Sequence, residues 1–340
     1  MKAAIYNEVG SVEVLKYEDV PEPEISPDEV LVRVKASSLN RLDLRLRSGK
    51  SPRPVNLPHV GGVDIAGDIE KVGRNVKGVK QGTRVVVSPT VKTISHKTGG
   101  ADLALNKVIG VNYWGGFAEL VKVPAENLVE IPEGLSYDEA STLPVCYVTA
   151  WYGLFDRGGL KPSETVLVHA AGSGTGSAAV QVAKLAGAYV IATAGSDEKL
   201  AKARKLGADE TINYSTCEFA DEVKRITDKR GVDLIFDQIG GSAWEGNISS
   251  LAPKGRLLLV GVVGGGAASA NIGPIIMRDI SVLGVTVFNA ELSTLATVAG
   301  LAVKGELKPV IDRAMPLSEA QAAQKLLEDR AQFGKVVLNP

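Results

Sequence analysis

Seven consecutive small residues, AGSGTGS, occupy positions 171–177 of this 340-residue sequence. Short side chains let a backbone approach a pyrophosphate closely, and the free N–H groups at the start of a following helix bind its charge. The spacing departs from G-x-G-x-x-G, because Ala171 and Ser173 stand at the first two glycine positions and only Gly176 is retained. The stretch nevertheless indicates a site for the phosphates of a dinucleotide.

The segments around this turn are those that such a site requires. Apolar runs at 166–170 and 189–193 predict buried strands, and Val180, Val182 and Leu185 recur near helical spacing between them. Strand, glycine-rich turn, helix and strand within about 30 residues form the βαβ unit that binds dinucleotides. The alternative is a βαβ unit of another open α/β sheet that binds no nucleotide.

The end of the second strand indicates which dinucleotide is used. Enzymes that prefer NAD usually place Asp or Glu there, on the ribose 2′-hydroxyl. This sequence instead reads Ala194-Gly195-Ser196, and Lys199 follows one helical turn later. Without a carboxylate to repel it, a 2′-phosphate could be bound by Ser196 and Lys199. We therefore expect NADP(H), and the alternative for Lys199 is a solvated helix position.

Composition excludes several classes of partner. The 38 Lys and Arg residues balance 39 Asp and Glu residues for a formal net charge of −1, so nucleic acid and anionic membrane surfaces are not expected partners. No apolar run reaches the roughly 18 residues of a membrane-spanning helix, and no signal peptide is recognisable. With only two cysteines, Cys146 and Cys217, a disulfide framework is not expected, and we expect a cytoplasmic protein.

Beyond the glycine-rich turn, the apolar patterns of the sequence predict an α/β fold in two parts. The central part continues as alternating strands and helices and predicts a doubly wound sheet of about six parallel strands. The first part is β-rich, and the chain's last segment returns to it as a strand. Strands are expected there at 2–6, 12–17, 29–36, 63–73, 82–87, 117–124, 128–132 and 334–338, and helices at 39–49 and 292–304. The aperiodic segment from Ser88 to Gly116 is expected near the substrate cleft, or else as a surface insertion.

Several motifs together are typical of one protein family. They are Gly61-Gly62-Val63-Asp64-Ile65-Ala66-Gly67, Gly82-Thr83-Arg84-Val85, Leu143-Pro144 followed by Thr149-Ala150-Trp151, the AAGSGTG turn, and Leu206-Gly207-Ala208-Asp209. On these the whole chain resembles the medium-chain dehydrogenase/reductase superfamily. The resemblance implies a GroES-like catalytic domain from residues 1–147 and 287–340, and a Rossmann dinucleotide-binding domain from residues 148–286.

The sequence departs from the zinc alcohol dehydrogenases of that superfamily. Those enzymes bind catalytic zinc through two cysteines and a histidine, and here the matching positions carry Asn40, Val63 and Cys146, of which only Cys146 is a ligand type. The acidic neighbour of the histidine position is Asp64. We therefore predict no metal. His59 could be offered as a substitute ligand, but loop packing is the favoured role.

Because it lacks these zinc ligands, the chain resembles the zinc-independent branch of the superfamily, the quinone oxidoreductase and enoyl reductase relatives. The resemblance implies NADPH-dependent transfer of hydride to a quinone or an α,β-unsaturated carbonyl, a small-molecule substrate. A conjugated acceptor spreads the developing charge, so hydrogen bonds can replace a Lewis acid. Asn40 is the expected polarising donor, and Asp64 and Arg45 are expected beside it in the cleft. Arg45 replaces a tyrosine of several relatives, so a tyrosine-acid mechanism is not assigned.

Other cofactor residues follow by matched position or by their place at strand ends. Arg41 and Lys335 are expected at the pyrophosphate, Thr149 at the nicotinamide and Tyr214 at the adenosine. The remaining expected contacts are Gly172, Ser173, Gly174 and Thr175 in the turn, Gly195 with Ser196 and Lys199, and Gly240, Gly261, Val262 and Phe288 at the carboxyl ends of strands.

Two other functions stay open at this point. One is an alcohol dehydrogenase with a degenerate zinc site, and the other is a nucleotide-binding protein without catalysis. The family resemblance also implies a homo-oligomer, a dimer or tetramer, in which residues 281–287 could pair at the sheet edge.

Overall fold

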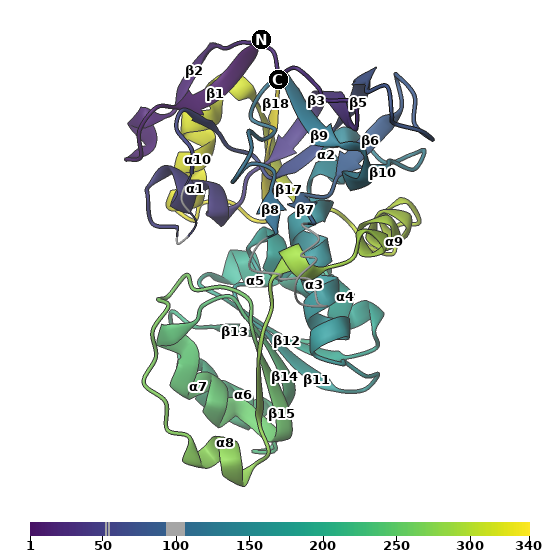
Figure 1. Ribbon diagram of the computed structural model, residues 1–340. Coiled ribbons are helices and arrows are strands. Elements are labelled where there is room, and N and C mark those ends of the chain that lie inside the picture. The colour runs from purple at the N-terminus through teal and green to yellow at the C-terminus, as the bar shows by residue number, and fades with distance from the viewer. Residues whose placement is uncertain (52, 54, 93–105) are drawn as a thin grey trace, which may run out of the picture. The chain divides into compact units, whose positions relative to one another are not determined.

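The computed structural model describes residues 1–51, 53, 55–92 and 106–340. The chain forms two compact units (Figure 1). The N-terminal unit holds residues 1–145, 288–305 and 309–340, and the central unit holds residues 146–287 and 306–308. Residues 306–308 were expected in the first domain. They lie in the central unit because the Lys308 carbonyl accepts hydrogen bonds from Tyr147 Oη and Gln181 Nε2, at 2.6 and 3.0 Å.

The N-terminal unit is built on β-sheets. Among its described residues, one sheet has the order β10-β6-β5-β3-β18-β17, with β9 also paired to β3, and smaller sheets have the orders β2-β1-β4 and β7-β8. The strands are β1 (Lys2–Tyr6), β2 (Lys16–Asp19), β3 (Glu29–Ser38), β4 (His59–Val60), β5 (Asp64–Val72), β6 (Arg84–Val87), β7 (Thr90–Val91), β8 (Lys107–Val108), β9 (Leu120–Pro124), β10 (Leu128–Glu130), β17 (Ile311–Pro316) and β18 (Lys335–Asn339).

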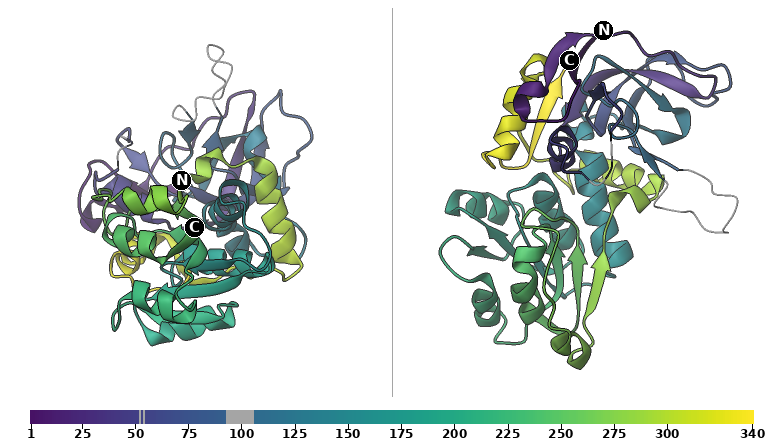
Figure 2. Two further views of the ribbon diagram at one scale, coloured as in Figure 1. Left: turned by 90° about the horizontal axis from the view of Figure 1, so that it is seen from below. Right: turned by 60° about the vertical axis from the view of Figure 1, so that its left-hand side comes forward.

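The register of this sheet brings three strand ends together. β3 pairs with β5 through Ser38 and Asp64, and β18 pairs with β3 through Val337 and Ser38. The right-hand view of Figure 2 shows the yellow C-terminal strand beside purple segments of the N-terminal unit. The end of β3 and the starts of β5 and β18 therefore meet, and this meeting point is where the candidate site lies.

Helices cover the N-terminal unit. They are α1 (Arg41–Arg47), α2 (Tyr137–Ser141), α9 (Leu292–Val303) and α10 (Ala320–Glu328). The guanidinium of Arg47, only 1% exposed, forms an ion pair with Glu328 and so ties α1 to α10. Leu44 of α1 packs in the same apolar cluster as Leu327 of α10 and Val336 of β18. This core fixes the helix that begins directly after Asn40.

The central unit confirms the predicted doubly wound fold. Its six strands are all parallel, in the order β13-β12-β11-β14-β15-β16. The strands are β11 (Thr165–Val168), β12 (Tyr189–Ala194), β13 (Glu210–Asn213), β14 (Val232–Asp237), β15 (Leu251–Leu259) and β16 (Ser281–Gly284). The helices are α3 (Val148–Trp151), α4 (Gly174–Leu185), α5 (Asp197–Lys205), α6 (Phe219–Ile226), α7 (Trp244–Ser250) and α8 (Gly273–Met277), with π-helical turns at Leu143–Tyr147 and Tyr152–Arg157. The strand order reverses between β11 and β14, which is where ligands bind in such sheets.

Several sequence expectations were wrong in detail. Residues Val12–Val14 form a 3-10 turn and the strand starts only at Lys16. The turn is closed by backbone hydrogen bonds from Val14 N to the Ser11 carbonyl and from Leu15 N to the Val12 carbonyl, both 3.2 Å. Strand β17 and helix α10 were not expected. For β17 the reason is that a half-exposed edge strand without clean alternation gives little strand signal in the sequence. Of residues 281–287, which were expected to form an edge strand, only Ser281–Gly284 are in strand β16. In the described part of the chain, no helix has the length and apolarity to cross a bilayer.

Candidate active site

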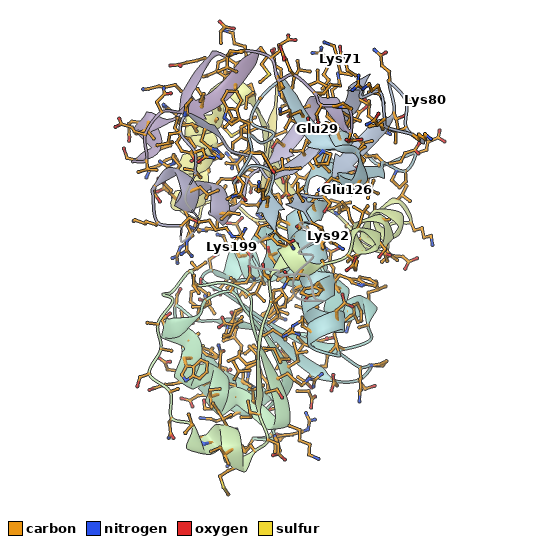
Figure 3. The ribbon with its side chains drawn as sticks, in the orientation of Figure 1. Glu29, Lys71, Lys80, Lys92, Glu126 and Lys199 are labelled. Atoms are coloured by element: carbon orange, nitrogen blue, oxygen red, sulfur yellow. The ribbon has the colours of Figure 1, made fainter. Side chains whose placement is uncertain are left out.

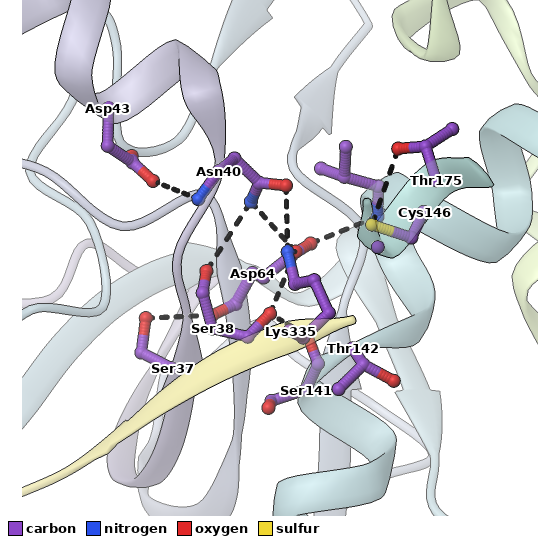
Figure 4. A network of polar contacts seen from close by, with 12 residues as sticks. Ser37, Ser38, Asn40, Asp43, Asp64, Ser141, Thr142, Cys146, Thr175 and Lys335 are labelled. Carbon is purple, nitrogen blue, oxygen red and sulfur yellow. Dashed lines mark hydrogen bonds and ion pairs between the residues drawn. The ribbon is translucent and has the colours of Figure 1, made fainter. Parts of the chain in front are cut away.

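A buried polar node joins three elements of the N-terminal unit (Figure 4). The ammonium of Lys335 lies 2.8 Å from Asn40 Oδ1 and 2.9 Å from Asp64 Oδ2, and Asn40 Nδ2 donates to Asp64 Oδ2 at 2.8 Å. Asp64 is fully buried and the Lys335 side chain is 4% exposed. The node therefore brings together Asn40 and Asp64, as predicted, and adds Lys335, which sequence reasoning had placed at the cofactor pyrophosphate.

Asp64 is fully occupied by hydrogen bonds. Its Oδ1 accepts from Val145 N at 3.0 Å, while its Oδ2 also lies 3.0 Å from Ser38 Oγ. The Ser38 hydroxyl is also 2.8 Å from the Ser141 carbonyl, so its single hydrogen serves one acceptor at a time. We infer that Asp64 positions its neighbours and does not itself touch a substrate.

The orientation of the Asn40 amide follows from its partners. A lysine ammonium only donates and an ionised carboxylate only accepts, so Oδ1 must face Lys335 and Nδ2 must face Asp64. The second amide hydrogen points toward the Ser38 carbonyl, and the distance from Asn40 Nδ2 to that carbonyl oxygen is a long 3.4 Å. This weakly held hydrogen is the one that an incoming acceptor can take over.

Asp43 fixes the backbone on both sides of this node. Its Oδ2 accepts from Asn40 N at 2.7 Å and its Oδ1 accepts from Gly62 N at 3.2 Å. Gly62 has a φ of 95°, and a Cβ there would lie 2.7 Å from Phe117 N, so the position requires glycine. Burial raises the pKa of Asp43 to about 7. Both contacts give this aspartate a structural role.

Stability should depend on pH through Asp43. Its pKa is about 7 in the folded chain against an ordinary 3.8, so the folded state binds the proton more tightly. The contribution of Asp43 to stability is fully present below its ordinary pKa of 3.8, and it is lost as pH rises through its folded pKa of about 7. We expect the advantage in urea midpoint of the wild type over Asp43→Asn to shrink as the pH is raised from near 4 to near 7. Parallel pH profiles for the two proteins would contradict this.

Other predicted residues of the N-terminal unit lie outside the node. Arg45 donates to the Lys50 carbonyl at 3.3 Å on the exposed side of α1. Arg41 is half-buried, and burial lowers its pKa, with the charge of Arg330 adding to the effect. Phe288 was expected at the carboxyl end of a strand, but β16 ends at Gly284, and Phe288 packs in an apolar cluster with Val63 in the N-terminal unit.

His59 has the packing role favoured from the sequence. Its Nε2 lies 3.0 Å from the Gly110 carbonyl, its ring contacts the Tyr6 ring edge-on, and burial lowers its pKa. Of the segment from Ser88 to Gly116, residues 93–105 lie outside the described residues.

In the central unit, the turn after β11 has the geometry of a phosphate cradle. Ser173 is the N-cap of α4, and its hydroxyl accepts from Gly176 N at 2.9 Å. A Cβ on Gly176 would lie 2.2 Å from the Ala170 carbonyl oxygen, so only glycine lets the helix approach the strand this closely. The start of α4, with Gly174 and Thr175, thus presents backbone N–H groups beyond the end of β11.

Sequence reasoning missed Gln238, which follows β14 on the other side of the switch point. Its Oε1 accepts from Ser173 Oγ at 3.0 Å, and its Nε2 donates to the His169 carbonyl at 2.9 Å. It therefore ties the phosphate turn to β14. The signal available in the sequence was the position of Gln238 directly after β14, the strand next to β11.

The remaining predicted cofactor residues follow the carboxyl ends of the same parallel strands. Ser196 is the N-cap of α5 and accepts from Lys199 N at 3.4 Å (Lys199 is labelled in Figure 3). A Cβ on Gly195 would lie 2.9 Å from Tyr214 Oη, so that Tyr214, 45% exposed, stands over this strand end. Gly172 lies in the β11 turn, and Gly240, Gly261 and Val262 follow β14 and β15.

Two predicted residues lie on the helical segment that opens the central unit. Thr149 is buried in α3. The Cys146 thiol is buried and accepts a hydrogen bond from Thr175 Oγ1 at 3.4 Å. Among the described residues, no three His, Cys, Asp or Glu side chains are grouped as a metal site would need.

Comparison with known proteins gives the family. Residues 26–133 match the alcohol dehydrogenase GroES-like domain, and residues 174–301 match the zinc-binding dehydrogenase domain. The chain is 34% identical to a zinc-type alcohol dehydrogenase-like protein of Schizosaccharomyces pombe, over 99% of both chains. The chain belongs to the medium-chain dehydrogenase/reductase superfamily. The resemblance inferred from its motifs is thereby confirmed.

Two further relatives place the chain within this superfamily. It is 30% identical to human quinone oxidoreductase, over 99% of this chain and 97% of that protein. A solved structure described as an NAD-dependent alcohol dehydrogenase matches at a TM-score of 0.93 with 39% identity, over 100% of both chains. The chain is thus an oxidoreductase of the quinone oxidoreductase-like branch, and membership of the superfamily supports a nicotinamide cofactor.

Proposed function

We propose that this chain is an NADPH-dependent reductase of quinones or α,β-unsaturated carbonyl compounds that works without a metal. The observation that supports it most is the buried Asn40–Asp64–Lys335 node. It provides a positioned amide and a positive charge where the zinc alcohol dehydrogenases of the superfamily carry metal ligands. The names of the human and bacterial quinone oxidoreductases among its relatives agree with the proposal.

The residues present do not fit catalytic zinc. Val63 is buried in an apolar cluster with Leu46, Val108 and Val111, and cannot bind a cation. The Asp64 carboxylate already accepts from four donors, and the one neutral amide, Asn40, is bound to Lys335. A zinc site needs at least three good protein ligands. The proposed reaction therefore uses no metal.

The central unit fits a nicotinamide dinucleotide. The turn around Ser173 and Gly176 would hold the pyrophosphate, and Thr149 would lie at the nicotinamide. When bound, the reduced nicotinamide supplies the hydride. The phosphorylated cofactor is favoured because the two residues directly after β12, Gly195 and Ser196, carry no carboxylate, and Lys199 follows in the first turn of α5. Asp197 also lies in that turn, but its carboxylate accepts from Asn213 Nδ2 at 2.7 Å.

In the proposed reaction, the node stabilises charge on the acceptor. Hydride addition to an activated C=C or a quinone leaves negative charge spread onto an oxygen. Asn40 Nδ2, which lies 3.4 Å from the Ser38 carbonyl oxygen, donates a hydrogen bond to that oxygen of the acceptor through its second hydrogen. Lys335 fixes the amide by donating to Asn40 Oδ1, and it adds positive potential. Asp64 holds Lys335 in place. Arg45, bound to the Lys50 carbonyl, has no part in this step.

Stopped-flow oxidation of NADPH by a panel of quinones and enones tests the proposal. We expect rapid oxidation with some panel members, unchanged after dialysis against a chelator, and little turnover with simple aldehydes. About one zinc per chain, together with activity lost to the chelator, would favour an alcohol dehydrogenase. A flat trace with every acceptor would favour a nucleotide-binding protein without catalysis.

Lys199→Ala should distinguish the two nicotinamide cofactors. Loss of a charged partner for the 2′-phosphate is expected to raise the KM for NADPH by about 10-fold, with the KM for NADH unchanged. Lys202→Ala is the matched control, because Lys202 lies on the same helix and pairs with Glu198 at 2.8 Å. Equal changes for both cofactors would contradict a 2′-phosphate contact.

We also propose that the chain works as a cytoplasmic homo-oligomer, with Cys146 and Cys217 in the reduced form. Strand β16 lies at the edge of its sheet, with β15 as its neighbour, so its outer backbone groups are open to pairing with a second copy. Sedimentation velocity should give a multiple of the chain mass, a dimer or tetramer. A single-chain mass at micromolar concentration would contradict this.

A further inference from the structure

A cavity of about 290 Å³ lies within the N-terminal unit, and the proposed reaction does not use it. Its walls include the aromatic rings of Tyr113 and Trp114, and Leu120 and Pro124 of β9 line it as well. Alternation along β9 turns these two residues away from the core, into which Val123 packs. The volume is about twice that of a cavity that holds one benzene ring, roughly 150 Å³, so it suits a two-ring molecule.

The side chains that line the cavity carry one charge of each sign, and the α-ammonium of Met1, which also lines it, donates to the Val20 carbonyl at 2.9 Å. Glu29 of β3 and Lys122 of β9 both line it, and they lie diagonally on one face because Glu29 pairs with Pro124, two residues along. Among the ion pairs between described residues, none joins these two side chains. The Glu29 carboxylate instead accepts from Ser26 N at 2.8 Å, and the Lys122 ammonium donates to the Glu24 carbonyl at 3.1 Å.

The aromatic wall is held in place as well. Trp114 Nε1 donates to the Pro58 carbonyl at 3.0 Å, and the Tyr113 ring stacks with the ammonium of Lys107, 5.6 Å from its centroid. Two opposite charges held apart beside a fixed aromatic wall match a ligand that has an ammonium, a carboxylate and a flat apolar ring system.

The cavity is separated from the Asn40–Asp64–Lys335 node by tightly packed backbone. Gly115, on the cavity wall, lies so close to Gly62 that a Cβ there would be 2.2 Å from the Gly62 carbonyl oxygen. Phe117 N also donates to the Gly61 carbonyl at 3.0 Å. None of Asn40, Asp64 and Lys335 lines the cavity. A molecule bound there would therefore not occupy the proposed substrate position.

We propose that this cavity is a second binding site, for an aromatic amino acid or a similar two-ring zwitterion. Its ammonium group pairs with Glu29, its carboxylate pairs with Lys122, and its rings lie against Trp114 and Tyr113.

Calorimetry on the purified full-length chain, without nicotinamide cofactor, tests the site with three indole probes. L-Tryptophan carries both charges, indole-3-propionate lacks the ammonium and tryptamine lacks the carboxylate. For a ligand of this size we expect L-tryptophan to bind with a dissociation constant of about 0.1–1 mM. No detectable binding of L-tryptophan at concentrations about ten times higher would overturn the proposal.

Two charge-removing variants should separate the probes. Lys122→Gln should weaken L-tryptophan and indole-3-propionate by about 2–5-fold and leave tryptamine unchanged, while Glu29→Gln should weaken L-tryptophan and tryptamine and leave indole-3-propionate unchanged. Lys80→Gln, an exposed lysine of the same unit labelled with Glu29 in Figure 3, is the control and should change none of them. Tyr113→Ala, at a 40% exposed position, should weaken all three probes. Affinities unchanged in all three site variants would show that the probes bind elsewhere and would overturn the assignment.

Discussion

Asp64→Asn is expected to lower the free energy of unfolding by about 3–5 kcal/mol, because it leaves the buried Lys335 ammonium without its counter-charge. The replacement preserves shape, yet it also puts an N–H where donors such as Val145 N now point. Urea unfolding followed by circular dichroism measures the loss. Turnover should fall as well, since the Asn40 amide loses the acceptor that orients it.

Two further variants show whether the effect comes from burial of the charge. Asp19→Asn removes the partner of Lys2 at a similar separation of 2.7 Å, but Asp19 is 77% exposed, so its unfolding midpoint should barely move. The double variant Asp64→Asn, Lys335→Met should recover much of the stability, because no buried charge is then left unpaired. A single Asp64→Asn protein as stable as the wild type would contradict the node as described.

Gly176→Ala is expected to weaken NADPH binding by at least about 10-fold. The new Cβ would lie 2.2 Å from the Ala170 carbonyl oxygen, so the turn or helix α4 must move, at a cost of about 1–3 kcal/mol. That movement displaces the backbone N–H groups proposed to bind the pyrophosphate. Titration of NADPH fluorescence with the purified protein gives the affinity directly.

Gly300→Ala is the matched control for this substitution. Gly300 lies within α9, and a Cβ there would meet no atom within 4 Å, so alanine should stabilise the helix by about 0.5–1 kcal/mol. NADPH affinity should be unchanged in this variant. If the Gly176 variant bound NADPH as tightly as the Gly300 variant, the cradle would be assigned to the wrong turn.

The central unit could be predicted from the sequence because its information is local. Apolar runs of four to six residues between glycine-containing turns indicate buried parallel strands, and β11, β12 and β14 have this form. The phosphate turn was found in the same way, even though Ala171 and Ser173 replace two glycines.

The node could be predicted only in part, because its members meet through tertiary pairing. Asn40 and Asp64 followed from motif positions, but Lys335 is 271 residues from Asp64 and was expected beside a phosphate. No local pattern shows that β18 pairs with β3 at Ser38. Val12–Val14 was mistaken for a strand because its alternating pattern is only three residues long, and backbone hydrogen bonds close these residues into a 3-10 turn.

The place of β18 between β3 and β17 has a consequence for biosynthesis. The central unit is made almost entirely before this strand exists, so it can fold on the nascent chain while the first unit still lacks an inner strand. Lys335, 295 positions after Asn40, is among the last parts of the site to be translated. Until Lys335 is made, Asp64 lacks the cation that pairs with it, so the node acquires its charge balance only once β18 has been translated.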